Sequence, residues 1–180
     1  MIYTSTYNST VGSLLLAADD IGLIGLWLNS DRFHADLLVS REHTSKETPI
    51  LRDTKRWLDI YFTGREPKIE LPFHLIGTPF RQEVWQLLLQ IPYGQVVTYG
   101  DLAKKMAEKR GVARMSAQAV GGAVGHNEIS IIIPCHRVIG ANGNLTGYGG
   151  GLDKKIKLLE LEGIDTHRLF WPTKLKSEHN

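Results

Sequence analysis

The chain has 180 residues and a mass of 20.2 kDa, enough for one large domain or two small ones. Hydrophobic residues make up 42% and charged residues 22%, which excludes wholesale disorder, collagen and low-complexity fibres. The net charge is +2, but residues 1–75 hold 8 basic and 10 acidic residues (net −2), and residues 76–180 hold 13 and 9 (net +4).

The beginning of the chain predicts a β-hairpin. Two apolar runs, Val11–Ala17 and Leu23–Leu28, lie on either side of a turn-forming Asp-Asp-Ile-Gly sequence at residues 19–22. A short helix is expected within Arg32–Ser40, and the polar residues 41–49 predict a loop.

A longer helix is predicted over Ile50–Phe62, because its apolar residues lie roughly on one helical face and Thr63-Gly64 follows as a stop. No catalytic combination of side chains occurs in this half. The proline-containing segment from residue 66 to 77 predicts a linker. We therefore expect an α/β domain at residues 1–75, a helical domain at 76–163 and a tail at 164–180, in which Trp171-Pro172 is the one apparent anchor.

The second half is predicted to be mainly helical. Thr78-Pro79 supplies a capping hydroxyl and a first-turn proline, and apolar residues recur at helical spacing as far as Ile91. After a brief extended link at Val96-Val97, Thr98 and Asp101 form the pattern of a capping box that opens a helix over residues 99–107.

A third helix is expected over Ser116–Val124, closed by Gly125. Two short helices joined by a turn fit a helix-turn-helix, although many helical hairpins bind nothing. The region around the turn is basic, which fits either a phosphate-binding surface or a solvated helix face. The basic residues are Lys104, Lys105, Lys109, Arg110 and Arg114.

Four isoleucines in Ile129–Ile133 predict a short buried strand that ends at the sequence PCHRV. Cys135 is the only cysteine, which excludes an internal disulfide and any zinc site that needs two cysteines. A thiolate is a nucleophile, and a neighbouring imidazole can take the thiol proton. Taken alone, a lone cysteine in this setting is more often a small buried hydrophobic residue. Because adjacent side chains of an extended chain point apart, contact between Cys135 and His136 requires a bend or a bridging water.

Six glycines occur within residues 139–151, but neither phosphate-binding motif, GxxxxGK[ST] or GxGxxG, is present. We expect a mobile or tightly turned wall beside the cysteine, with Tyr148 as its aromatic residue. A fourth helix follows, with Leu152, Ile156 and Leu159 on its core face and Gly163 as its stop. Glu162 comes at the C-terminal end, where the helix dipole disfavours a carboxylate, so it is a candidate to orient an imidazole.

Three stretches resemble the O6-alkylguanine-DNA alkyltransferases (methylated-DNA–protein-cysteine methyltransferases): TPFRQEVWQLLLQIPYGQVVTYGDLA, AVGGAVGHN, and PCHRV with GNLTGYGGGLDKKIKLLELEG after it. The similarity is highly specific over residues 78–163. Residues 1–75 match only in pattern, as the family's N-terminal domain. The resemblance implies an α/β (α+β) fold, with a small ribonuclease-H-like sheet domain followed by a helical domain that carries the helix-turn-helix and PCHRV.

The resemblance implies five catalytic roles. Cys135 would accept the alkyl group from O6 of guanine in one irreversible step. His136 would deprotonate it through a water, and Glu162 would orient His136. Asn127 would hold the active-site turn by hydrogen bonds, and Tyr99 would lie over the flipped nucleotide and donate to the guanine ring.

The resemblance also implies how the base is held. The backbone carbonyls of Cys135 and Val138 would accept from the guanine amine. Tyr148 and Gly149 would line the pocket on the glycine-rich side, and Arg137 would be structural, tying down the turn.

The third helix is the expected DNA-binding element. Its small side, which includes Ala119 and Gly122, would admit the backbone to a groove, or else it packs closely against another helix. The family usually has an arginine before AVGG that enters the base stack, whereas this chain has Gln118, and Arg114 one turn earlier could partly substitute. Charge alone adds Lys104, Lys105 and Arg110 as phosphate contacts. A second departure is Glu128, where proline is common.

We therefore predict a single-turnover DNA-repair methyltransferase that acts on double-stranded DNA carrying O6-alkylguanine. A cysteine hydrolase is a poorer interpretation because a sequence-adjacent Cys and His make a weak dyad. A module that recognises alkylated bases without repair is the other alternative, although such relatives replace the cysteine. No cofactor or metal is expected, since the seven histidines show no paired spacing. No secretory signal or apolar run of ~20 residues is visible, so a cytoplasmic monomer without membrane contact is expected.

Overall fold

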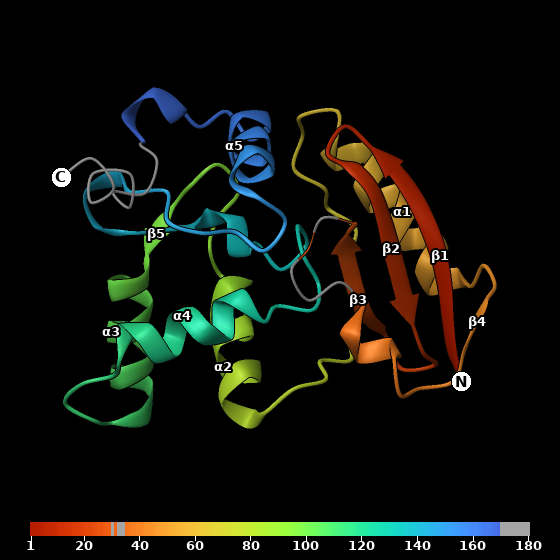
Figure 1. Cartoon of the computed structure of the whole chain (residues 1–180), viewed down its shortest axis with the longest axis horizontal. Coiled ribbons are helices and arrows are strands. Elements are labelled where there is room, and N and C mark those ends of the chain that lie inside the picture. Colours follow the sequence, from red (N-terminus) through yellow and green to blue (C-terminus); the bar gives the residue numbers. More distant parts are fainter. Residues whose placement is uncertain (30, 32–34, 170–180) are drawn as a thin grey trace, which may run out of the picture.

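The computed structural model describes residues 1–29, 31 and 35–169. A four-stranded sheet in the order β3-β2-β1-β4 forms the N-terminal part, on the right of Figure 1. The predicted hairpin is confirmed: β2 (Gly12–Ala18) pairs antiparallel with β3 (Leu23–Leu28). A further strand, β1 (Ile2–Ser9), pairs antiparallel with β2.

The expectation of a loop at residues 41–49 is wrong for β4 (His43–Ser45), which pairs in parallel with β1. All three β4 residues are exposed. The strand is therefore held by backbone pairing at the edge of the sheet and has no apolar pattern to reveal it. Of the helix expected within residues 32–40, the described part contains the 3₁₀ turn η1 (Asp36–Leu38).

The predicted helix after this loop is confirmed as α1 (Pro49–Tyr61), which the Thr48 hydroxyl caps at the amide of Leu51. It contacts β1 and β2 across the face of the sheet, as Figure 1 shows. Its buried residues include Leu58 and Tyr61, so the last turn of α1 is anchored in the core. Tyr61, at the end of α1, therefore contacts the C-terminal half of the molecule.

The C-terminal half is helical, as predicted. It contains α2 (Pro79–Leu88), α3 (Tyr99–Arg110), α4 (Ala117–Gly125) and α5 (Leu152–Leu161). Thr78 and Ser116 cap α2 and α4, and the capping box of Thr98 and Asp101 is present at α3. α3 and α4 pack against each other and against α2.

Short elements connect these helices. β5 (Val97–Thr98) pairs in parallel with β6 (Val138–Ile139). Three further 3₁₀ turns complete the described chain: η2 (Cys135–Arg137), η3 (Ala141–Gly143) and η4 (Thr166–Arg168). Trp171-Pro172, expected to anchor the tail, lies outside the described residues.

The strand predicted at Ile129–Ile133 is wrong, because this buried segment is a compact turn in which Ile131 has a φ of 71°. Its isoleucines are all buried, and an apolar run of this length does not distinguish a strand from a buried turn. The backbone of Leu26 in β3 pairs with it, donating to Glu128 O (2.8 Å) and accepting from Ser130 N (2.9 Å).

The core face predicted for α5 is partly wrong. Leu159 is buried, but Leu152 and Ile156 are only half-buried, and the buried positions are Lys155, Leu158 and Leu159. A buried lysine breaks the apolar pattern on which the prediction rested. Its ammonium is fully hydrogen-bonded to backbone carbonyls, as shown below.

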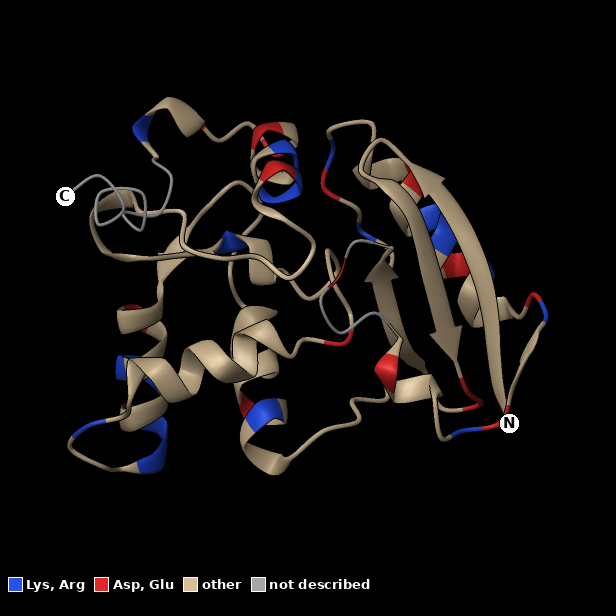
Figure 2. Cartoon of the chain, in the orientation of Figure 1, with Lys and Arg blue, Asp and Glu red and all other residues tan. Residues whose placement is uncertain are grey.

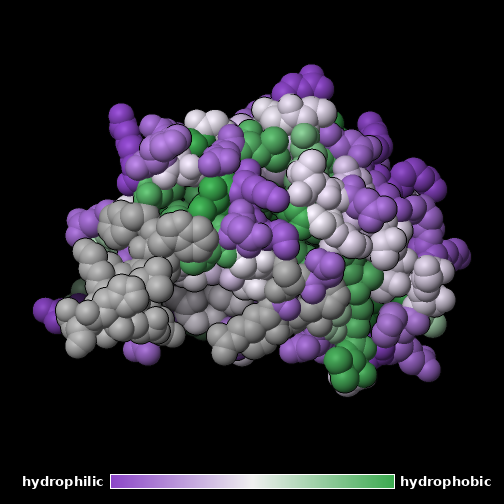
Figure 3. Space-filling view, turned by 45° about the horizontal axis from the view of Figure 1, so that its top comes forward, coloured by the Kyte–Doolittle hydropathy of each residue, from purple (hydrophilic) through white to green (hydrophobic). Residues whose placement is uncertain are grey.

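One hydrophobic core joins the two halves and draws on β2, β3 and all five α-helices. Every residue of β3 is buried, because its outer edge pairs with residues 72–74 and with the turn at 128–130. Hydrophobic residues on the face seen in Figure 3 lie in small areas among hydrophilic ones. Among the described helices, none is both long and apolar enough to span a bilayer.

Candidate active site

A cavity of about 490 Å³ opens where α4, the turn after it and the glycine-rich segment meet. It is lined from four parts of the chain, and its lining includes Asp31, Tyr99, Gly122, Asn127, Cys135 and Tyr148. The structure thus brings together residues that the sequence separates by more than a hundred positions. Gly147 and Gly149 complete the wall on the glycine-rich side. Among the described residues, no group of three or more His, Cys, Asp or Glu could hold a metal ion.

Cys135 lies in the wall of this cavity and is only 8% exposed. It begins the 3₁₀ turn η2, and its amide donates to the carbonyl of Ile133 (2.8 Å). Burial raises the pKa of the Cys135 thiol to about 11, against the opposing effect of a hydrogen bond with Asn127. The resting thiol is therefore protonated at neutral pH, and a nucleophilic role requires a base.

Asn127 holds the turn that leads to Cys135. Its Nδ2 donates to the carbonyls of Ile133 (2.8 Å) and Ile129 (3.3 Å), and its Oδ1 accepts from the amide of Ile129 (3.0 Å). One side chain therefore satisfies three backbone groups in a segment without regular secondary structure. This geometry supports the holding role that the resemblance implied.

His136 is fully buried and hydrogen-bonds to Glu162, with 2.5 Å between Nε2 and Oε2. A carboxylate can only accept, so the proton of this hydrogen bond belongs to Nε2. Nδ1 of the neutral ring is then a bare acceptor, and it has no hydrogen-bond partner among the described residues. Burial lowers the pKa of His136, although Glu162 acts to raise it. The lowered pKa keeps the ring neutral and able to take a proton.

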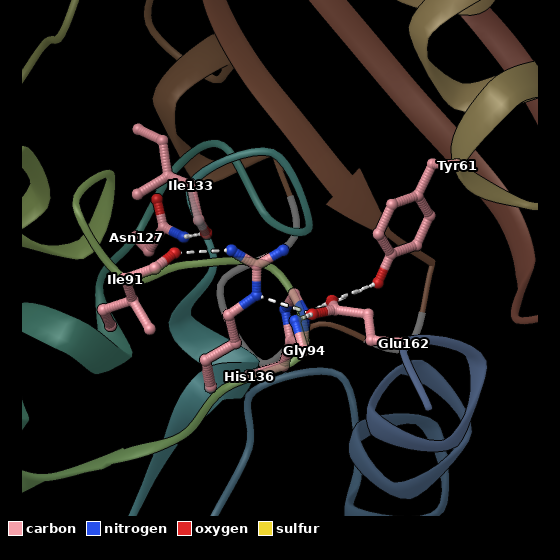
Figure 4. Close-up of polar contacts among 8 residues, drawn as sticks. Tyr61, Ile91, Gly94, Asn127, Ile133, His136 and Glu162 are labelled. Atoms are coloured by element: carbon pink, nitrogen blue, oxygen red, sulfur yellow. Dashed lines mark hydrogen bonds and ion pairs between the residues drawn. The ribbon is translucent and has the colours of Figure 1, made fainter. Parts of the chain in front are cut away.

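Glu162 follows α5 as its C-terminal cap and is 6% exposed. Its Oε1 accepts from Arg137 Nε (2.7 Å) and from the amide of Gly94 (3.0 Å), and its Oε2 accepts from His136 and from the hydroxyl of Tyr61 (2.7 Å) (Figure 4). Burial alone would raise its pKa, but the hydrogen bonds from His136 and Arg137 outweigh burial and lower the pKa to about 2. Glu162 is therefore ionised at neutral pH, and four hydrogen bonds hold its carboxylate in place against His136.

Arg137 links Glu162 to the segment that follows α2. Besides Glu162, it donates through Nη1 to the carbonyl of Ile91 (2.8 Å), and its guanidinium lies over the ring of Tyr93 (5.6 Å). These contacts join η2 to the segment that follows α2. They support the structural role implied for Arg137.

Sequence reasoning missed Tyr61. The residue is buried at the end of α1, and the helical pattern marks it only as part of an apolar face. Nothing in its neighbourhood in the sequence indicates a polar partner 101 positions away. Only the packing of the two halves reveals that partner.

Lys155 was also missed as a site residue. Its side chain is fully buried, and its Nζ donates to the carbonyls of Val138 (2.7 Å), Leu145 (2.7 Å) and Gly147 (3.2 Å). It thereby ties the strand after Cys135 to the glycine-rich wall. The predicted base contact at Val138 would use the second lone pair of that carbonyl, and Val138 is not among the described residues that line the cavity.

The two tyrosines assigned to the base reach the cavity wall from different parts of the chain. Tyr99 begins α3, and its hydroxyl accepts a hydrogen bond from Thr146 Oγ1 (3.4 Å). Tyr148 comes from the glycine-rich segment beside Gly149, and its buried hydroxyl has no hydrogen-bond partner among the described residues. Both rings can therefore contact a flat ligand inside the cavity.

The expected DNA-binding residues lie on the exposed side of α3 and α4. Gln118, Ala119 and Gly122 of α4 are exposed, and a Cβ at Gly122 would meet nothing within 4 Å. Figure 2 shows α4 without charge and blue segments along α3 and on the loop that follows it. These basic residues, Lys104, Lys105, Arg110 and Arg114, are exposed.

Arg110 differs from the other basic residues because it is bound within the fold. It pairs with Glu83 of α2 (2.7 Å) and lies over the ring of Phe80 (5.2 Å). The charge of Arg110 is thus partly neutralised by Glu83, whereas Lys104, Lys105 and Arg114 face solvent.

Known protein families match both halves of the chain. Residues 2–75 match the ribonuclease-like domain of 6-O-methylguanine DNA methyltransferase, and residues 79–164 match the DNA binding domain of the same family. A methylated-DNA–protein-cysteine methyltransferase of Mycobacterium tuberculosis is 41% identical over 162 residues, which is 90% of this chain and 93% of that protein. A constitutive enzyme of that name from Bacillus subtilis is 38% identical, over 91% of this chain and 97% of its own.

Solved structures agree with these sequence matches. The crystal structure of Mycobacterium tuberculosis OGT in complex with DNA superposes with a TM-score of 0.75 at 40% identity, covering 93% of this chain and 94% of that one. An O6-methylguanine DNA methyltransferase from Methanococcus jannaschii gives a TM-score of 0.59 at 26% identity, covering 89% and 94%. With both family domains present in order and relatives of about 40% identity over most of its length, this chain belongs to the 6-O-methylguanine DNA methyltransferase family.

Proposed function

We propose that this protein repairs double-stranded DNA by transferring the alkyl group of O6-alkylguanine to its own Cys135. The observation that carries the proposal is the arrangement around that residue. A buried thiol lies in the wall of a cavity about 490 Å³ in volume, and the next residue in the chain, His136, is a neutral imidazole whose Nε2 proton is held by Glu162. Nδ1 is left to accept a proton.

The transfer is a nucleophilic displacement. His136 takes the thiol proton through a water, the sulfur forms a bond to the alkyl carbon, and the carbon–O6 bond breaks with its electron pair passing to the guanine. In net terms the thiol proton ends on the guanine, which Tyr99 assists by donating to the ring. At a pKa of about 11, roughly one thiol in 10⁴ is ionised at pH 7, so the base is required. The thioether product is not readily hydrolysed, and each molecule therefore acts once.

The lesion reaches the cavity by leaving the duplex. A thiol this deeply buried cannot contact a base inside the stack, so the nucleotide must flip. The exposed face of α4 supports this geometry, because no neighbour within the described fold requires glycine at residue 122. Glycine there costs the helix about 1 kcal/mol relative to alanine, which close approach of a DNA backbone would explain.

The remaining assignments complete the proposal. Gln118 enters the base stack in place of the usual arginine, with Arg114, Lys104, Lys105 and Arg110 toward the phosphates. Inside the cavity, Tyr148 and Gly149 contact the base, and the carbonyls of Cys135 and Val138 bind its amine. We also propose that the protein acts as a monomer in the cytoplasm, where a lone thiol stays reduced.

The test is intact-mass measurement after incubation with a duplex that carries one O6-methylguanine. We expect a gain of one methyl group on Cys135 and no gain in Cys135→Ser. Tight, lesion-preferring binding with no mass gain would instead show a recognition module. No mass gain and no preference for the lesion would overturn the proposal altogether.

A further inference from the structure

Tyr61 brings the N-terminal domain into direct contact with the candidate catalytic pair. Its hydroxyl donates to Glu162 Oε2 (2.7 Å) and lies 3.4 Å from His136 Nε2 (Figure 4). The ring is fixed by a stacked contact with Trp57 (5.3 Å between centroids) and by an edge contact with Phe62 (5.3 Å). Tyr61 is fully buried, so its hydroxyl has no access to solvent as an alternative partner.

We propose that Tyr61 is a positioning residue for alkyl transfer, whose hydroxyl holds Glu162 Oε2 so that His136 keeps its Nε2 proton and presents Nδ1 as the base. The inference rests on the proposed function and deepens it. It makes α1, from a domain that contributes no nucleophile or base, part of the machinery that activates Cys135.

The argument depends on how Oε2 is shared. Two donors, the Tyr61 hydroxyl and His136 Nε2–H, meet at this one oxygen, while Arg137 and the Gly94 amide occupy Oε1. Loss of the hydroxyl would leave His136 as the only donor to Oε2 among these contacts. The carboxylate would then attract the imidazole proton more strongly, stabilise the imidazolium and raise the pKa of His136.

The Tyr61 hydroxyl stays protonated, and so remains a hydrogen-bond donor, over the pH range in which methyl transfer is measured. Burial, followed by the charge of Glu162, raises the pKa of Tyr61 well above its ordinary value. A phenol that stays protonated can only donate to a carboxylate. The Tyr61 hydroxyl therefore always stabilises the ionised form of Glu162.

Several other groups face this cluster and contribute to its titration. From η2 comes Arg137, from the segment after α2 comes Tyr93, and from the glycine-rich segment comes Tyr148. From α5 comes Lys155, whose charge acts on His136. None of these groups is altered when the Tyr61 hydroxyl alone is removed. Any change in the titration of His136 in Tyr61→Phe therefore reports the loss of that hydroxyl.

Tyr93 offers a matched control. Its ring packs edge-on against that of Tyr61 (6.3 Å between centroids), but its buried hydroxyl has no hydrogen-bond partner among the described residues. Tyr93→Phe therefore removes a hydroxyl from the same aromatic cluster without removing a hydrogen bond to Glu162. The ring over Arg137 is kept.

The experiment compares the single-turnover rate of methyl transfer from an O6-methylguanine duplex in the wild type, Tyr61→Phe and Tyr93→Phe across pH. We expect Tyr61→Phe to be slower at neutral pH by about tenfold, because Glu162 Oε2 is no longer held in place to orient the imidazole. Its loss of rate on acidification should begin at a higher pH, since a more basic His136 is protonated sooner. Tyr93→Phe should match the wild type in both respects. A merely structural role for Tyr61 would lower the rate without moving the acidic limb.

A second measurement is independent of transfer. The pKa of His136, followed by NMR of its ring nitrogens and assigned with His136→Gln, should rise in Tyr61→Phe and not in Tyr93→Phe. If Tyr61→Phe keeps the wild-type rate profile and His136 pKa, the positioning role is overturned while the proposed function stands. If the wild type itself transfers no methyl group, the proposed function fails and the inference fails with it.

Discussion

The indole Nε1 of Trp27 donates a hydrogen bond of 2.8 Å to Oε2 of Glu128 across 101 positions of the sequence. Trp27 belongs to β3 and is 1% exposed, whereas Glu128 directly follows Asn127 in the turn before Cys135. The neighbouring backbone bond from Leu26 N to Glu128 O (2.8 Å) joins the same two segments. The N-terminal sheet therefore fixes the active-site turn at a position where a proline would offer no side-chain acceptor.

Removal of this acceptor should destabilise the protein. Glu128→Ala leaves the buried indole N–H without its partner, and we expect the free energy of unfolding to fall by about 1–3 kcal/mol. Glu128→Gln retains an acceptor oxygen and should lose less. Urea unfolding of the three proteins measures the difference. Equal stability of Glu128→Ala and Glu128→Gln would show that the indole bond contributes nothing.

The His136 base predicts a characteristic pH dependence of methyl transfer. His136→Gln should transfer methyl about 10²–10³ times more slowly at neutral pH, because the thiol must then ionise unaided. With the thiol pKa at about 11, the rate of this variant should rise nearly tenfold per pH unit toward that value. The wild type should show a plateau at neutral pH and lose rate only as His136 becomes protonated on the acidic side, below its ordinary range. Rapid-quench single-turnover assays check both profiles, and parallel profiles would exclude His136 as the base.

The sequence predicts most of the helices here because their signals are local. Thr78 and Thr98 cap the helices they precede, as their side chains indicate. The exposed strand at residues 43–45 and the buried turn at 129–133 were mispredicted, since the first is defined by backbone pairing and the second is as apolar as a strand.

The residues of the candidate site likewise include some that the sequence predicts and others that only the structure reveals. Cys135, His136 and Glu162 belong to a motif with a specific resemblance, so they could be named in advance. Tyr61 and Lys155 act through partners far away in the sequence or on the backbone, and neither leaves a local pattern. Only the packed structure reveals residues of this kind.

Lys155 should control the shape of the glycine-rich wall. Lys155→Met keeps the length of the side chain but leaves the carbonyls of Val138, Leu145 and Gly147 without their shared donor. We expect stability to fall by about 2 kcal/mol and amide exchange across residues 141–150 to accelerate. Lys157→Met, at an exposed position of the same helix, is the control. Unchanged exchange in Lys155→Met would mean that the wall keeps its shape without the ammonium.

The basic residues near α3 should differ in their contribution to DNA affinity. Lys104, Lys105 and Arg114 face solvent, so neutralising all three should reduce the slope of log affinity against log salt by up to about 3. Arg110→Gln should change this slope less and stability more, because Arg110 pairs with Glu83. Fluorescence anisotropy at several salt concentrations tests this. An unchanged slope in the triple variant would remove the three residues from the DNA footprint.

Gln118 is exposed on α4, whose described surface carries no charge of its own. Glutamine can fill the space of an extruded base, but it lacks the charge and the planar guanidinium of arginine. Gln118→Arg should therefore raise DNA affinity and speed the repair of O6-methylguanine several-fold, with the salt slope steeper by about 1 if the added charge contacts a phosphate. Gln118→Met, which fills the same space without polarity, separates hydrogen bonding from volume. If Gln118→Arg leaves both the repair rate and the affinity unchanged, the missing arginine does not limit base flipping in this protein.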